Sequence, residues 1–162
     1  MEFTKAFTVL LGFEGTAFTE TKGDDGKKTK YGISEKAYPT LDIENLTQDK
    51  AESIYGTDYW LKCKISYLPE SLQYMVFDTA VNCGQGTAIM ILQKAGGVTA
   101  DGLIGDHTIA AAEKVTIEMY ADARKAHYND VIIANPTDEK FRTGWFNRVE
   151  KIVQMQLNGE LI

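Results

Sequence analysis

Apolar residues recur at helical spacing along most of the chain. Between residues 3 and 13 they form one stripe, because positions three and four apart share a helical face; its members are Phe3, Ala6, Phe7, Leu10 and Leu11. Similar stripes follow further along the sequence. They predict about six helices, over residues 3–13, 47–60, 69–83, 88–95, 107–128 and 144–157.

Residue types at the ends of these stripes set the expected boundaries. Thr47 is a suitable N-cap, since its hydroxyl can accept a hydrogen bond from the first helical turn. Pro69 suits the first position of a helix, where no backbone N–H is needed. Asp106 would cap the helix over residues 107–128.

Residues 17–34 break the helical period. Their Gly, Asp, Lys and Thr content is typical of turns and short strands, which predicts a small β-hairpin after the first helix. With 162 residues, the chain has the size of one domain that can bury a core of its own. The pattern therefore predicts a mainly α single domain with one small β element.

The charge of the chain narrows the choice of partner. The formal net charge is −6 at pH 7, whereas nucleic-acid-binding proteins show a basic surface. The same charge provides no attraction to anionic membranes or wall polymers, so we expect a substrate that is neutral or locally cationic. No segment reaches the roughly 18 apolar residues of a membrane span.

The two cysteines and two histidines do not form a metal-binding pattern. Cys63 and Cys83 are far apart, and His107 and His127 show no zinc-ligand spacing with them. We expect no metal and no organic cofactor. Two free thiols and one disulfide both remain open, because a disulfide requires a geometry that the sequence does not reveal.

A carboxylate at the end of the first helix is the main candidate for chemistry. Glu14 would lie where the helix dipole and apolar neighbours both favour the protonated carboxyl, as a general acid requires. Asp24 or Asp25, among lysines in a polar loop, would stay ionised, and Thr29 could orient a water molecule. Two such carboxyls are the usual equipment of glycosidases, although a surface Glu followed by an ordinary turn would give the same local pattern.

In the order of several motifs, the sequence resembles glycoside hydrolase family 108. This family comprises the N-acetylmuramidase endolysins of phages and the related muramidases of bacteria. The similarity runs nearly end to end and rests on VLLGFEG, DDGKKTKYGIS, NLTQDKAESIYGTDYW, VFDTAVNCGQGTAIMILQKAGG, DGLIGDHTIAA and FRTGWFNRV. The resemblance implies a lysozyme-like α+β fold in residues 1–162. It further implies a catalytic portion over 1–93 and a C-terminal helical portion over 94–162 that resembles a peptidoglycan-binding region.

Carried over residue by residue, the resemblance implies Glu14 as the catalytic acid, Asp24 as the second carboxylate and Thr29 as its assistant. The family's Glu-Gly-Gly is here Glu-Gly-Thr, and its Asp-Pro-Gly-Gly turn is Asp-Asp-Gly-Lys. Because of these departures, Asp25 is the alternative to Asp24 as the second carboxylate. If Asp24 has that role, we expect Asp25 to bind substrate.

Three further residues are candidates for substrate binding. Asp78 and Asn82 share a helical face, so they would line the glycan cleft or, alternatively, form a buried polar pair that joins helices. Tyr31 would stack on a sugar ring, as Tyr59 and Trp60 also could, or else belong to the core. The segment DGLIGDHT is similar to a loop-to-helix motif of wall-binding modules, but a tight turn followed by a helix cap explains it equally well.

The function that the resemblance implies is hydrolysis of the β-1,4 bond between N-acetylmuramic acid and N-acetylglucosamine in bacterial peptidoglycan. The alternative is a non-catalytic wall-binding or phage structural protein on the same fold. Glu2 lies where a signal peptide needs positive charge. We therefore expect a monomeric phage endolysin, made in the host cytoplasm and released to the wall by a separate pore-forming protein. Its negative charge would also suit wall glycan that carries deacetylated, cationic glucosamine.

Overall fold

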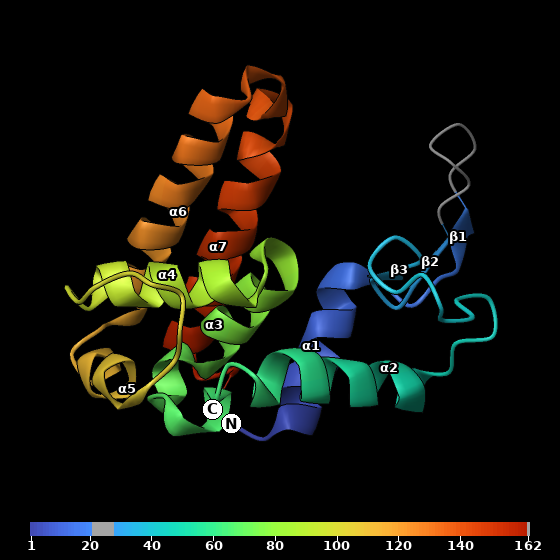
Figure 1. Ribbon diagram of the computed structural model, residues 1–162, viewed down its shortest axis with the longest axis horizontal. Coiled ribbons are helices and arrows are strands. Elements are labelled where there is room, and N and C mark those ends of the chain that lie inside the picture. The colour runs from blue at the N-terminus through green and yellow to red at the C-terminus, as the bar shows by residue number, and fades with distance from the viewer. Residues whose placement is uncertain (21–27, 162) are drawn as a thin grey trace. The chain divides into compact units, whose positions relative to one another are not determined.

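The computed structural model describes residues 1–20 and 28–161. This part of the chain is mainly helical with one small antiparallel sheet (Figure 1), which confirms the predicted fold class. In chain order the elements are α1 (Phe3–Glu14), β1 (Thr19–Glu20), β2 (Lys28–Lys30), β3 (Ile33–Ser34), α2 (Gln48–Tyr55), the π-helical η1 (Gly56–Leu61), the 3₁₀ turn η2 (Ile65–Tyr67), α3 (Glu70–Cys83), α4 (Gln85–Ala95), α5 (Asp106–Ala112), α6 (Ile117–Ala134), the 3₁₀ turn η3 (Pro136–Phe141) and α7 (Arg142–Leu157).

The chain forms two compact units. The first, Glu2–Asp58, contains α1, the sheet and α2, and its core joins the apolar face of α1 to that of α2. The second comprises Tyr59–Ile162 together with Met1. The predicted division of function after residue 93 stays a prediction.

The sheet of the first unit has the strand order β1-β2-β3, and both pairs are antiparallel. Lys30 pairs with Ile33, so Tyr31 and Gly32 alone connect β2 to β3. Their φ angles are +53° and +77°. Two positive φ angles define the type I′ turn, whose twist matches that of the strands it joins.

In the second unit, α3 is the central helix. Residues 72–80 are buried on every side, because α3 packs against α4, α6 and α7. α6 and α7 run side by side as a helical hairpin (Figure 1). A helix enclosed in this way has no solvent-facing stripe, so its polar side chains must find partners within the protein.

Several predicted boundaries are confirmed and some are wrong. The Thr47 hydroxyl caps α2 by accepting a hydrogen bond from the Lys50 N–H. The single helix expected over 107–128 is two helices, since Thr116 caps α6 in the same manner. Asp106 is the first residue of α5 rather than its cap, and Pro69 precedes the first residue of α3.

Two further properties follow from the coordinates. Within the described residues, none of the helices has the length and apolar character required to cross a membrane. Cys63 and Cys83 are both free thiols. Burial raises the pKa of the Cys63 thiol to about 11, so this thiol is not a reactive nucleophile at neutral pH.

Candidate active site

Glu14 is the last residue of α1, where the sequence predicts it. Gly15 ends the helix: its N–H donates to the Leu11 carbonyl at 2.8 Å while its own φ is +79°. The Glu14 side chain is partly buried, and the last turn of α1 contains no basic residue. The carboxyl is therefore held at a helix end that carries the partial negative charge of its free carbonyl groups.

The β2–β3 turn packs directly on Glu14. A β-carbon placed on Gly32 would lie 3.0 Å from both Cβ and Cγ of Glu14. The same β-carbon would lie 2.7 Å from Oη of Tyr55. Gly32 thus permits the close approach of three segments, namely the end of α1, the turn and the end of α2.

Tyr55 fixes this arrangement from the α2 side. Its hydroxyl donates a hydrogen bond to the Tyr31 carbonyl at 3.0 Å, and its ring contacts Phe7 of α1 with centroids 5.9 Å apart. The helical pattern predicts Tyr55 as a core residue, which it is. Its link to the turn could not be predicted, because nothing in the local sequence relates it to Tyr31.

Thr29 lies on the central strand β2, two residues before the turn, opposite Thr19 and Ser34. Its neighbours Lys28 and Lys30 both donate hydrogen bonds to Glu44. Lys28 binds the carboxylate of Glu44 at 3.0 Å, and Lys30 binds its backbone carbonyl at 3.0 Å. The hydrogen bond and the charge of Glu44 raise the pKa of Lys28. Because side chains alternate along a strand, Thr29 faces the side of the sheet opposite to these lysines.

The other predicted residues of this region differ in what can be said of them. Asp24 and Asp25 lie outside the described residues. Tyr31 is partly buried in the turn, with the Lys30 ammonium 5.7 Å from its ring centroid. Trp60 belongs to the core, where its indole N–H donates to Ser66.

Asp78 has the structural role that was the alternative prediction. Its side chain has no exposed surface. Its carboxylate forms ion pairs with the guanidinium groups of Arg124, at 2.8 Å, and Arg148, at 2.6 Å. Burial opposes the charge of Arg124, yet the adjacent Asp78 carboxylate raises the pKa of this guanidinium. Asp78 therefore joins α3 to α6 and α7 instead of facing solvent.

Asn82 lies one turn after Asp78 and is exposed. Its side-chain N–H donates to the Asp78 carbonyl at 2.8 Å. It also lines a pocket of about 270 Å³ with Cys83, His127 and Trp145. Substrate binding by Asn82 stays a prediction.

In residues 1–20 and 28–161, no cluster of three or more His, Cys, Asp or Glu side chains could hold a metal ion.

Comparisons with known proteins give two family matches and a similar solved structure. Residues 7–84 match the family described as Glycosyl hydrolase 108, and residues 87–150 match the family described as Predicted Peptidoglycan domain. The solved structure of SagA from Brucella abortus has a TM-score of 0.82 and 30% sequence identity to this chain, covering 96% of this chain and 94% of that one. Among curated proteins there is no match.

Proposed function

The chain belongs to the glycosyl hydrolase 108 family, and from this premise we propose that it cleaves the β-1,4 bond between N-acetylmuramic acid and N-acetylglucosamine. The family, together with the match to a peptidoglycan domain, supports a glycoside hydrolase that acts on peptidoglycan. The choice of this particular bond, and of the residues that cleave it, is our proposal.

The packing of the β2–β3 turn on Glu14 is the observation that carries the proposal. Catalysis requires the acid to be held in one geometry before the substrate arrives. The contact with Gly32, and the hydrogen bond from Tyr55 to Tyr31, restrict the side chain of Glu14 in this way. A surface glutamate in an ordinary helix terminus would have no such support.

In the proposed reaction, Glu14 donates its proton to the oxygen of the scissile bond as the bond from that oxygen to the sugar C1 breaks. Positive charge develops on C1 and the ring oxygen, and a second carboxylate stabilises it. Asp24 is our candidate for this carboxylate, and Asp25 is the alternative. The hydroxyl of Thr29 would orient the water molecule that adds to C1. One of the two carboxylates, deprotonated Glu14 or the second one, would take the proton that this water gives up.

The test of Glu14 is a substitution that keeps the shape of its side chain. We expect Glu14→Gln to lose at least about 100-fold in the rate of clearing of outer-membrane-permeabilised cells, because the amide has no acidic proton. Glu2→Gln is the matched control, since Glu2 is exposed at the opposite end of the same helix and its side chain does not cap α1. Equal clearing by wild type and Glu14→Gln would remove Glu14 from the mechanism.

Mass spectrometry of the released fragments tests the choice of bond. Reducing ends on muramic acid are expected from a muramidase. Anhydro ends would instead indicate a transglycosylase, and new free amino groups a peptidase. Binding to sacculi without any fragment release would favour a non-catalytic wall-binding protein.

The biological role that we propose is that of a bacteriolytic phage endolysin. Its support is the resemblance of the motifs to the muramidases of phages. A separate pore-forming protein would then give the enzyme access to the wall. Expression in a bacterium with and without such a protein tests this role, and we expect lysis only when both are present.

A further inference from the structure

A pocket in the second unit lies where the loop between α4 and α5 folds back on α4. Its volume is about 460 Å³, which lies in the usual range of about 300–1,000 Å³ for ligand sites. The residues that line it include Asp101, Thr99 and His107. None of these side chains has a part in the proposed hydrolysis.

One buried amide holds the loop in place. Gln93 of α4 has 2% of its surface exposed. The two hydrogens of its Nε2 are shared among three acceptors, Asp101 Oδ1 at 2.7 Å, the Leu103 carbonyl at 3.0 Å and the Thr108 hydroxyl at 3.0 Å. Its Oε1 accepts a hydrogen bond from the Gly102 N–H at 2.9 Å. The amide therefore uses both its donor and its acceptor groups on this loop.

Gly102 allows the backbone of the loop to lie close against α4. Its φ is +75°, and an added β-carbon would lie 3.1 Å from the Gly86 carbonyl oxygen. The loop backbone is thus in close contact with α4. A loop that is held by the Gln93 amide and by this close contact loses little further entropy when a ligand binds.

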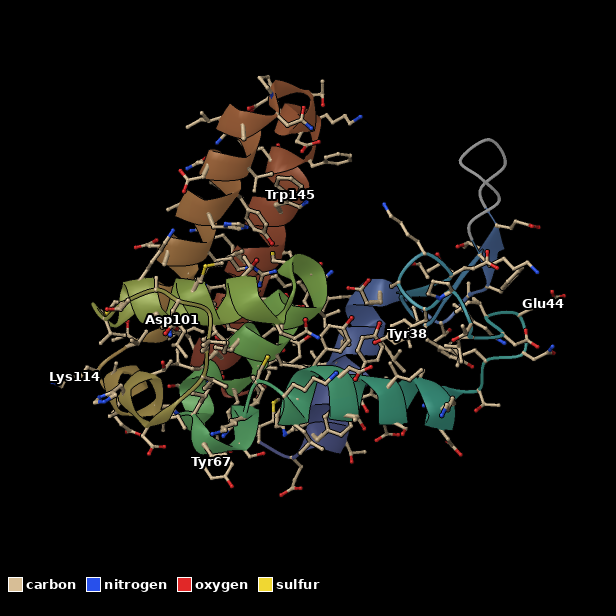
Figure 2. The ribbon with its side chains drawn as sticks, in the orientation of Figure 1. Tyr38, Glu44, Tyr67, Asp101, Lys114 and Trp145 are labelled. Carbon is tan, nitrogen blue, oxygen red and sulfur yellow. The ribbon has the colours of Figure 1, made fainter. Side chains whose placement is uncertain are left out.

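Asp101 supplies the charge of the pocket. Its Oδ1 accepts hydrogen bonds from Gln93 and from the Leu103 N–H at 2.9 Å. These bonds, that of the Leu103 backbone first, lower the pKa of Asp101, so the carboxylate is ionised at neutral pH. The residue is exposed on the loop (Figure 2).

We propose that this pocket binds a primary ammonium group of the bacterial cell wall, with Asp101 as its counter-ion. The proposal rests on peptidoglycan being the substrate. A wall offers such a group in two places, the side chain of a diamino acid in the wall peptide and a de-N-acetylated glucosamine in the glycan. The Thr99 hydroxyl would accept a second hydrogen bond from the same ammonium, and the net charge of −6 disfavours an anionic ligand.

Binding is measured by calorimetry with Glu14→Gln as the background, so that the ligands are not cleaved. Two pairs of probes separate the two sources. One pair is a disaccharide tetrapeptide with the side-chain amine of its diamino acid free or acetylated. The other is chitotetraose and its de-N-acetylated form. In at least one pair, we expect the free amine to bind about tenfold tighter than its acetylated partner, as for a charge-assisted hydrogen bond.

Asp101→Asn tests the assigned counter-ion. The amide oxygen can still accept the hydrogen bonds of Gln93 and Leu103, while the charge is lost, and we expect the tenfold preference for the free amine to disappear. Asp106→Asn removes a neighbouring charge that does not line the pocket and should keep the preference. Thr99→Trp is a second test, to be used if Asp101→Asn proves unstable. It should fill the pocket without changing the Asp101 contacts, and we expect it to abolish the preference as well.

The outcomes are distinct from those for the proposed function. Equal binding of free and acetylated amines in both pairs would overturn the proposal that the pocket binds ammonium. An unchanged preference in Asp101→Asn would overturn it as well. Either result would hold even if Glu14-dependent hydrolysis is intact. Conversely, an Asp101-dependent preference without any hydrolysis would support the pocket and remove only the catalytic proposal.

Discussion

At Gly32, two separate constraints exclude a side chain. The φ of +77° is unfavourable for any residue with a β-carbon, and the position of that carbon is already within 3.0 Å of Glu14 and Tyr55. We expect Gly32→Ala to lower the free energy of unfolding by about 2–4 kcal/mol. We also expect at least a tenfold loss in kcat, because the turn would displace the proposed acid.

Gly159→Ala is the control for Gly32→Ala. Gly159 has a nearly identical φ of +75°, but no atom lies within 4 Å of the position of its β-carbon. It should therefore show only the backbone cost, about 1 kcal/mol, with full activity. Chemical denaturation gives the stability of both variants, and a glycan cleavage assay gives kcat. Similar kcat values for the two variants would show that the contact with Glu14 has no effect on catalysis.

Tyr55→Phe tests the same device with a smaller change. Loss of the hydroxyl removes the hydrogen bond to the Tyr31 carbonyl, and we expect stability to fall by about 1 kcal/mol. Because the hydroxyl positions the turn, kcat should fall several-fold while KM is unchanged. Tyr120→Phe removes an equivalent hydrogen bond to the Ala88 carbonyl in the second unit. If the two variants lose activity equally, the effect is one of stability and not of position.

Among the elements, the contact of α3 with α6 and α7 depends on a buried charge. One carboxylate, Asp78, serves two guanidinium groups, those of Arg124 and Arg148. We expect Asp78→Asn to destabilise the protein by about 3–5 kcal/mol, since it leaves Arg124 buried without a counter-ion. Thermal or denaturant unfolding measures this loss.

A surface ion pair provides the comparison for Asp78→Asn. Glu139 and Arg142 are both solvent-exposed in part and lie 2.7 Å apart. Glu139→Gln should cost far less stability than Asp78→Asn, because water screens the pair. A comparably small cost for Asp78→Asn would mean that solvent reaches the Asp78 cluster.

The helices were predictable to the extent that their signals are local. The apolar stripe of α1 and the Thr47 cap of α2 depend on neighbouring residues, and both are confirmed. The break between α5 and α6 was missed because the apolar period continues through it, although Thr116 is a cap of the same type as Thr47. The contact of Gly32 with Glu14 and the hydrogen bond from Tyr55 to Tyr31 join residues that are distant in sequence, and no local pattern predicts them.

For the molecule as a whole, the sequence predicts only part of the candidate site. The sequence locates Glu14 at a helix end and predicts a small β-hairpin within residues 17–34, the segment that contains Thr29, and the structure agrees for both elements. It leaves Asp78 open as either a cleft residue or part of a buried polar pair, because an acidic side chain on a helix gives no sign of its burial. Only the packing of three helices around it reveals that the carboxylate neutralises two arginines.

The net charge of −6 affects encounter with the wall. Sacculi that carry anionic secondary polymers should repel the protein, and the range of this repulsion shrinks from about 30 Å at 10 mM salt to about 10 Å at 100 mM. We therefore expect the initial rate of cleavage of such sacculi to rise about two- to fivefold over this interval. The same sacculi stripped of these polymers serve as the control and should show no rise. A rate that falls with salt on both substrates would mean that local attraction, such as that of the Asp101 pocket for ammonium groups, outweighs the overall charge.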